Sequence, residues 1–208
     1  MDLFQFKSKS IKKRFGIDEE RFGIIFSFID FGNVNYWFED DIRDKEGNVL
    51  KKDQKLVIDL KKLGDFSSLF SKKSRFYFGL DSSKRKSVGF ISRARDYFDN
   101  VITKEIQEVK HYLKDDELQS TTRSVNQDLE GSYIYIPKCN FDVEISVDAI
   151  RLIDKYDTFC LFSSDADFIS LVRFLKKNKK KFILVKSGYV KHDLINPADS
   201  VIKAQDIK

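Results

Sequence analysis

The sequence has little cysteine, proline and glycine, and these shortages exclude several classes of protein. Its 208 residues hold two cysteines, Cys139 and Cys160, which are too few for a disulfide framework and lie in no metal-binding spacing. Two prolines and nine glycines leave little room for long flexible linkers. No stretch approaches the roughly 20 apolar residues that cross a bilayer, and no apolar run follows the basic N-terminus as in a signal peptide. We therefore expect a cytoplasmic protein with no membrane partner.

Several nucleotide-binding and hydrolytic motifs are also missing. The sequence has neither GxxxxGK(S/T) nor GxGxxG, the two glycine-rich loops that cradle phosphates. It has no HExxH and no GxSxG, and the DxD of haloacid-type enzymes is absent because position 32 is Gly. These absences leave metal-dependent phosphoryl chemistry as the most economical use of the acidic residues described below.

Twenty phenylalanines and a hydrophobic share of 41% predict one domain with an aromatic core. Apolar runs that alternate with helix-period segments predict an α/β fold with a mostly parallel sheet covered on both faces. We predict strands over residues 21–30, 75–81, 102–113, 132–137, 158–163 and 181–187, and helices over 53–70, 87–99, 142–155 and 166–178. Residues 114–131 lack apolar periodicity and are predicted to be a surface loop. The tail is expected to add an edge strand or a short helix.

Aspartates stand at three predicted junctions between a strand and a helix. They are Asp30, Asp142 and the pair Asp165 and Asp167, and Asn33 follows the first of them closely. Ligands of open α/β sheets bind beyond the carboxyl ends of the strands. We therefore expect these side chains to meet at one edge of the sheet.

Two interpretations of these aspartates compete. Aspartate is a favoured N-cap and complements the helix dipole, so each residue taken singly is explained by capping. Converging carboxylates, however, repel one another unless a cation or shared protons lie between them. Oxygen ligands without His or Cys select a hard cation, Mg²⁺ or Mn²⁺, and such a cation activates water for attack.

Lysine and arginine form four clusters, over residues 7–14, 72–75, 82–87 and 176–181. Basic clusters suit a phosphate backbone, but each one alone is also typical of a solvated surface. Tyr36 and Trp37, after the first junction, are suited either to stacking on a base or to core packing.

Three segments resemble, in order and spacing, the signature blocks of NYN domains, the LabA-like branch of the PIN-domain nucleases. They are "FIDFGNVNYW" (28–37), "KCNFDVEISVDAI" (138–150) and "DTFCLFSSDADFISLVRFLKKNKKKFILV" (157–185). Two positions depart from the family pattern, since Phe31 and Ser164 stand where glycine is usual. The resemblance implies a PIN-like α/β/α sandwich, with residues 1–20 as a basic extension and 21–208 as the nuclease domain.

The resemblance also implies a metal-dependent endoribonuclease acting on single-stranded or structured RNA. Carried over by position, the catalytic residues are Asp30, Asn33, Asp142, Asp165 and Asp167. Asp30, Asp142 and Asp165 would bind Mg²⁺ or Mn²⁺, and Asn33 would orient Asp30 or the scissile phosphate. Asp167 would bind a second metal or a water, Asp148 would support the site from its helix, and Lys138 would meet a substrate phosphate.

Two other functions fit the same residues. One is a non-catalytic RNA-binding or regulatory scaffold of the same fold. The other is a Toprim-like phosphotransferase, although that family has a glutamate where this chain has Asp30. A homodimer is a further prediction that the sequence leaves open.

Overall fold

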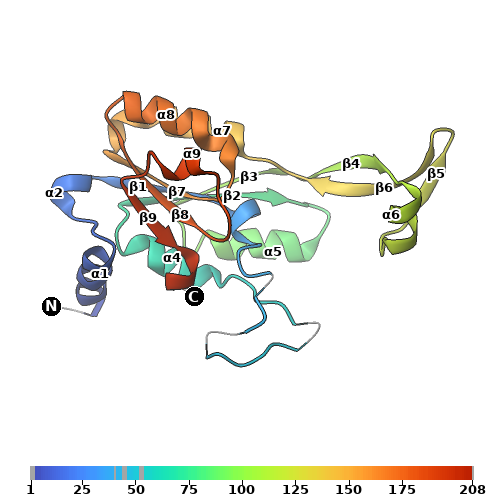
Figure 1. Cartoon of the computed structure of the whole chain (residues 1–208), viewed down its shortest axis with the longest axis horizontal. Coiled ribbons are helices and arrows are strands. Elements are labelled where there is room, and N and C mark those ends of the chain that lie inside the picture. Colours follow the sequence, from blue (N-terminus) through green and yellow to red (C-terminus); the bar gives the residue numbers. More distant parts are fainter. Residues whose placement is uncertain (1–2, 40, 44–45, 52–53, 208) are drawn as a thin grey trace.

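A six-stranded, entirely parallel sheet forms the centre of the molecule (Figure 1). The computed structural model describes residues 3–39, 41–43, 46–51 and 54–207. Across the sheet the strands run in the order β3 (Asn100–Glu105), β2 (Lys73–Leu80), β1 (Ile25–Asp30), β7 (Thr158–Phe162), β8 (Lys181–Lys186) and β9 (Ser200–Lys203). Every pairing is parallel, so all six strands end at the same edge of the sheet.

The two faces of this sheet bury different side chains of the same strands. In β1, Ile25 and Ile29 belong to one core cluster, whereas Phe26 and Phe28 belong to the other. This is the period-two alternation of a strand covered on both sides. The predicted PIN-like α/β/α sandwich with a mostly parallel sheet is confirmed.

Helices cover both faces, as Figure 1 shows. The first face is covered by α4 (Leu60–Ser68) and α5 (Arg85–Ala94), and the second by α7 (Asp142–Arg151), α8 (Ile169–Lys177) and α9 (His192–Ile195). Shorter elements are α2 (Glu19–Phe22), α3 (Phe31–Val34), η1 (Ile153–Lys155), η2 (Ala166–Phe168) and η3 (Ala204–Ile207). Within the described residues, none of the helices has the length and hydrophobicity needed to span a bilayer.

The N-terminal helix α1 (Leu3–Arg14) is attached to the first core cluster. Ile11 packs against this cluster, as does Phe15 just beyond the helix. The Ser8 hydroxyl donates a hydrogen bond to the backbone carbonyl of Leu69 at 2.5 Å. Whether residues 1–20 act as a separate extension stays a prediction.

A second, antiparallel sheet projects from the body as an arm (Figure 1). We call residues 107–138 the β-arm. It consists of β4 (Gln107–Tyr112), β6 (Gly131–Lys138) and β5 (Asn126–Asp128) in the order β4-β6-β5, with α6 (Asp115–Ser120) between β4 and β5. Among the side chains described in this segment, Ile134 alone is buried. The β-arm therefore has almost no core of its own.

Two sequence predictions are wrong in and beside the β-arm. The predicted strand over 102–113 is two strands, β3 and β4, which belong to different sheets and meet at Ile106, and the predicted loop over 114–131 contains α6 and β5. The predicted strand over 132–137 is confirmed as β6, but it lies in the antiparallel sheet and not in the central one. Period-two alternation is the same in either sheet, so the pattern does not reveal where a chain changes its partners.

The predicted helix over residues 53–70 is shorter in the structure. Helix α4 begins at Leu60 because the Asp59 carboxylate accepts a hydrogen bond from the backbone N–H of Lys62 at 3.1 Å and caps the helix. Residues 54–59 precede it without helical structure, and residue 53 lies outside the described residues. The tail forms both of the expected elements, since β9 is followed directly by η3.

Candidate active site

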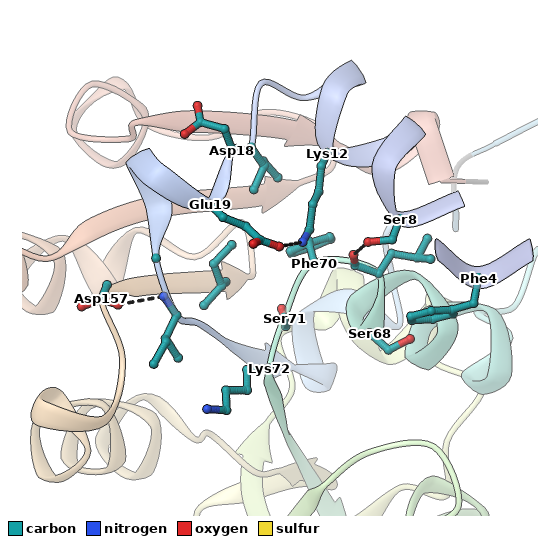
Figure 2. A pocket seen from close by; sticks show the side chains of 15 residues that line it. Phe4, Ser8, Lys12, Asp18, Glu19, Ser68, Phe70, Ser71, Lys72 and Asp157 are labelled. Carbon is teal, nitrogen blue, oxygen red and sulfur yellow. Dashed lines mark hydrogen bonds and ion pairs between the residues drawn. The ribbon is translucent and has the colours of Figure 1, made fainter. Parts of the chain in front are cut away.

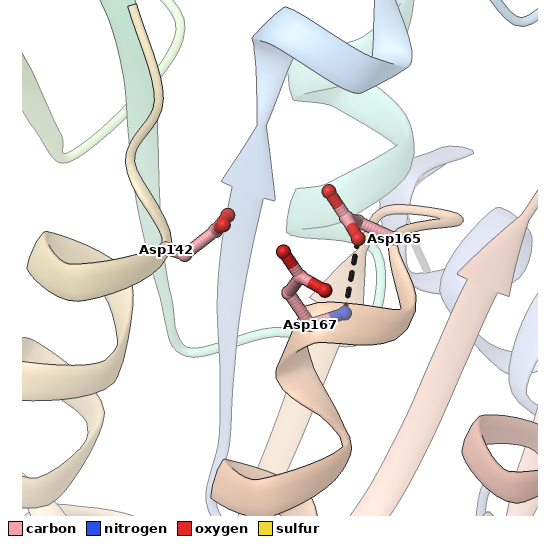
Figure 3. A group of neighbouring side chains, drawn as sticks. All are labelled: Asp142, Asp165 and Asp167. Carbon is pink, nitrogen blue, oxygen red and sulfur yellow. Dashed lines mark hydrogen bonds between the residues drawn. The ribbon is translucent and has the colours of Figure 1, made fainter.

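Three aspartates from two separate turns face one another at the carboxyl edge of the central sheet (Figure 3). Asp165 and Asp167 lie in the turn between β7 and α8, and Asp142 is the first residue of α7. One carboxylate oxygen from each residue lies within 4.8 Å of the other two. We call these three residues the acidic cluster.

Asp142 reaches the acidic cluster by a route that differs from the predicted one. The strand before it, β6, was expected in the central sheet but belongs to the β-arm. Asn140 then fixes the start of α7. Its side-chain oxygen accepts a hydrogen bond from the backbone N–H of Asp142 at 2.9 Å, and its amide donates to the Asp142 carboxylate at 2.7 Å. The carboxylate is therefore held at the first turn of the helix.

Like charges surround Asp142. Partial burial raises the pKa of its carboxyl, and the negative charges of Asp165 and Asp167 raise it further, against the hydrogen bond from Asn140. The folded protein thus holds three acidic groups closer together than their charges favour.

Asp30 lies beside the acidic cluster, at the end of β1, and is 8% exposed. Its carboxylate accepts a hydrogen bond from the Ser163 hydroxyl at 3.0 Å. Burial raises the pKa of this carboxyl to about 6, opposed by the bond from Ser163 and the nearby backbone N–H of Asn33 and assisted by the charges of Asp142 and Asp165. The predicted metal ligands are Asp30, Asp142 and Asp165. The acidic cluster contains Asp167 in place of Asp30, which lies beside it.

Capping explains only one of the four aspartates. Asp165 caps η2, because its side chain accepts a hydrogen bond from the backbone N–H of Asp167 at 2.9 Å (Figure 3). Asp142 and Asp167 lie inside their helices. Asp30 is the N-cap residue of α3, and the backbone N–H of Asn33 lies near enough to lower its pKa but makes no capping hydrogen bond to its side chain. The convergence of the four carboxyl groups thus needs an explanation other than helix capping.

Asn33 joins two of the junctions. Its side-chain oxygen accepts hydrogen bonds from the backbone N–H of Ser164 at 2.8 Å and from the indole N–H of Trp37 at 3.1 Å. Ser164, which replaces the family glycine, also donates through its hydroxyl to the carbonyl of Ser187 at 2.8 Å. Asn33 therefore connects the segment after β1 with the segment after β7. Its predicted role in orienting a phosphate stays a prediction.

Lys138 and Asp148, the other predicted residues, lie in different surroundings. Lys138 lines a cavity of about 460 Å³ together with Asp30, Asp142 and Asp165, which we call the acidic pocket. Asp148 lies further along α7, where its carboxylate accepts hydrogen bonds from Arg75 at 2.5 Å and from the Tyr77 hydroxyl at 2.9 Å. Asp148 therefore anchors α7 to β2 and makes no bond to the acidic cluster.

Ser163 belongs to none of the predicted site residues, yet it connects two of the acids. Its hydroxyl donates to Asp30 and accepts a hydrogen bond from the backbone N–H of Asp165 at 3.1 Å. The signal in the sequence is a hydroxyl directly after a fully buried strand, where an apolar residue would continue the core.

Only one of the four basic clusters, residues 82–87, follows a strand at the carboxyl edge. The cluster over 7–14 lies in α1, that over 72–75 begins β2, and that over 176–181 joins the end of α8 to the start of β8. Several members are already paired, for example Lys73 with Asp99 and Lys176 with Asp199. Three of the four clusters therefore lie away from the acids, and for these the structure favours the interpretation as solvated surface.

A glycine holds the base of the β-arm against the central sheet. A Cβ atom added to Gly79, in β2, would lie 2.7 Å from the Ile106 side chain and 2.9 Å from the Cβ of Cys139. We expect Gly79→Ala to lower the free energy of unfolding by about 1–3 kcal/mol and to displace the segment that leads to Asp142. Thermal unfolding followed by circular dichroism measures the first effect.

Gly89→Ala is the matched control for this prediction. Gly89 lies inside α5, and its added Cβ would meet nothing within 4 Å. Because alanine favours the helix, this variant should be as stable as the parent protein or more so, by up to about 1 kcal/mol. A Gly79→Ala variant as stable as Gly89→Ala would show that the contact at Gly79 is not tight.

A second cavity, of about 530 Å³, opens at the other end of the sheet (Figure 2). Its charged groups are largely matched within the protein. Lys12 pairs with Glu19 at 2.6 Å, and the Asp157 carboxylate accepts a hydrogen bond from the backbone N–H of Ile24 at 2.8 Å. This cavity is therefore separate from the acidic cluster and has no comparable concentration of like charge.

Comparisons with known proteins bear on the fold and the family. A protein of unknown function from Vibrio parahaemolyticus has a similar structure, with a TM-score of 0.59 over 88% of this chain and 93% of that chain, at 20% sequence identity. At this identity the similarity shows the fold alone. No curated protein matches the sequence. The NYN domain family matches residues 28–205, a range that begins just before Asp30 and includes the whole acidic cluster. Since this match spans most of the chain, the protein belongs to the NYN domain family, as its three sequence blocks predict.

Proposed function

We propose that the protein is a metal-dependent endoribonuclease that hydrolyses phosphodiester bonds of RNA. The observation that carries this proposal is the acidic cluster, three carboxylates within 4.8 Å with the buried Asp30 beside them. NYN domains belong to the PIN-like nuclease superfamily, whose members generally use divalent metal ions. A cation offsets the repulsion among the carboxylates, so the same ion would stabilise the site and serve the reaction.

The donor set fits Mg²⁺ or Mn²⁺. The ligands on offer are carboxylate oxygens, which these hard cations prefer. Opposite ligands of Mg²⁺ are about 4.2 Å apart, so small side-chain rotations would bring Asp142, Asp165 and Asp167 into range. The predicted ligand Asp30 lies close enough to Asp142 and Asp165 for their charges to raise the pKa of its carboxyl. We propose that the Asp30 carboxylate would be a further ligand for the ion.

When bound, the cation supplies positive charge for the phosphate and lowers the pKa of a water molecule. The residues of the chain then have positioning roles. The Ser163 hydroxyl holds the Asp30 carboxylate, and Asn33 holds the turn that carries Asp165. Lys138 has no ion-pair partner among the described residues and lines the acidic pocket. We propose that its ammonium group binds a phosphate of the substrate.

The finer assignments rest on the sequence. The order and spacing of the three blocks support the LabA-like branch of the family. Two cysteines without disulfide or metal spacing support a location in the cytoplasm. The homodimer stays a prediction.

Cleavage of a labelled single-stranded RNA tests the proposal. The purified protein should cut the strand with Mn²⁺ or Mg²⁺ and should lose this activity in EDTA. A DNA strand of the same sequence, assayed in parallel, reports whether the sugar is recognised. RNA binding without cutting under every condition would contradict the nuclease and support the scaffold. Cutting confined to DNA would favour the Toprim-like alternative.

A further inference from the structure

Tyr36 is an exposed aromatic side chain on the wall of the acidic pocket. It is 63% exposed, whereas its neighbour Trp37 is 9% exposed and packs against Phe162 with 6.5 Å between ring centroids. The sequence suggests either stacking or core packing for both residues, and the structure shows that only Trp37 is buried. Trp37 belongs to the core, and the ring of Tyr36 is free to meet a ligand in the same cavity as Asp30 and Lys138.

The backbone around Tyr36 is held on both sides. The N–H of Tyr36 donates to the carbonyl of Asn33 at 3.2 Å, and the Trp37 indole donates to the side chain of Asn33. The carbonyl of Trp37 accepts a hydrogen bond from the Ser187 hydroxyl at 2.9 Å. Because the backbone is held here, stacking on a ligand has to order only the side chain of Tyr36.

The charges at this edge suit a polyanion that crosses the pocket. Lys138 lies on the pocket wall, and Arg85 and Lys86 follow β2 at the same edge of the sheet. None of the three has an ion-pair partner among the described residues. A strand with one phosphate at the acidic cluster would therefore find cationic side chains for flanking phosphates.

We infer that Tyr36 stacks on an unpaired base of single-stranded RNA whose scissile phosphate lies at the acidic cluster. This inference rests on the proposed function and adds the class of substrate. The faces of the bases are covered by their neighbours inside a duplex, so a stacking residue of this kind requires a base that has left the helix. Tyr36 thus selects single-stranded RNA over duplex RNA.

The β-arm offers a second group of tyrosines but suits RNA less well. Tyr112 and Tyr133 lie on one face of it, and Lys110, which pairs with Asp128, already lies 4.0 Å from the ring centroid of Tyr133. Residues 107–138 hold six acidic and four basic side chains. This excess of negative charge opposes a polyanion, so the pocket is the favoured place for stacking.

Binding assays in EDTA test the inference without cleavage. The probe is a fluorescent single-stranded RNA of about 12 nucleotides, with affinity measured by anisotropy. We expect Tyr36→Ala to weaken binding about tenfold or more and Tyr36→Phe to keep it within about twofold, since the ring remains. Tyr189→Ala is the matched control, because Tyr189 is 82% exposed in the loop after β8, outside the acidic pocket. It should bind as the parent protein does.

Abasic substitutions in the RNA identify the stacked base. Removing the base that contacts Tyr36 should weaken binding to the parent protein by the same factor as Tyr36→Ala. The two changes together should cost no more than either alone. Duplex RNA of the same sequence should bind more weakly, with no change on Tyr36→Ala.

Each outcome separates this inference from the proposed function. If the parent protein cuts RNA but Tyr36→Ala binds normally, the inference is overturned and the nuclease stands. The inference is also overturned if every abasic position weakens the binding of Tyr36→Ala as much as it weakens that of the parent protein. It is likewise overturned if Tyr189→Ala loses as much affinity for RNA as Tyr36→Ala does. If Tyr36 and one base prove coupled but no RNA is cut, stacking at Tyr36 is upheld and the nuclease fails.

Discussion

Asp165→Asn and Asp142→Asn should each lower the proposed metal-dependent cleavage of RNA by about 100-fold or more. Each substitution removes one negative charge from a cluster whose carboxylate oxygens lie within 4.8 Å of one another. Replacing even the outer partners of a metal ligand costs about 10- to 100-fold, so the loss of a ligand itself should reach or exceed that range. Single-turnover cleavage of labelled RNA at saturating Mn²⁺ measures the effect.

Asp154→Asn is the matched control for these variants. Asp154 is an exposed aspartate in η1, and its replacement has the same change of charge and shape. Its cleavage rate should equal that of the parent protein. Cleavage at the normal rate by Asp165→Asn and Asp142→Asn would show that the activity arises elsewhere, in another site or in a contaminating nuclease.

Asp30→Asn should make the metal-free protein more stable at pH 8, with a melting temperature raised by about 5 °C. In the folded protein, burial raises the pKa of the Asp30 carboxyl from 3.8 to about 6. Its ionised form therefore destabilises the fold by about 2–3 kcal/mol at alkaline pH. Asparagine removes that cost and loses part of the interaction with Ser163 and Asn33, and each 1 kcal/mol shifts the melting temperature of a chain of this size by about 2–4 °C.

The sign of this effect depends on pH. The raised pKa means that the destabilisation is absent below the unfolded value of 3.8, grows between 3.8 and about 6, and is complete above it. The advantage of Asp30→Asn should therefore be full at pH 8 and only about half as large at pH 5. Differential scanning calorimetry in EDTA at both values measures it. An equal advantage at both, or a lower melting temperature at pH 8, would contradict a buried charge at Asp30.

Divalent cations provide a companion measurement on the same samples. A cation that binds the folded state alone raises its melting temperature with concentration. The parent protein should respond to Mg²⁺ at pH 8, whereas Asp165→Asn should respond less. Asp154→Asn again serves as the control and should respond as the parent protein does.

Several features of the fold could be predicted because local chemistry decides them. The run from Ile25 to Asp30 is buried at every position, and strands of this kind occur in parallel sheets covered on both faces. The turn after β7 brings Asp165 and Asp167 together by two residues of spacing alone. Such features depend only on residues that are adjacent in the sequence, so they can be predicted without the tertiary structure.

Other features depend on contacts between distant parts of the chain. The alternation of β4 and β6 predicts strands, but whether they join the central sheet is decided by packing at Ile106, Gly79 and Cys139. The difference between Tyr36 and Trp37 arises in the same way, because the indole finds Asn33 and Phe162. Residues adjacent in the sequence therefore determine neither the sheet that β4 and β6 join nor the different burial of Tyr36 and Trp37.

The parallel sheet, the family and the acids at the junctions follow from apolar runs and short motifs, which are local patterns of the sequence. Three features follow from tertiary contacts instead: Asp142 arrives from the β-arm, Ser163 connects Asp30 with Asp165, and three basic clusters lie away from the acids. The physical reason is common to all three. Each depends on which segments come to lie side by side, and this is decided by the burial of side chains far apart in the chain.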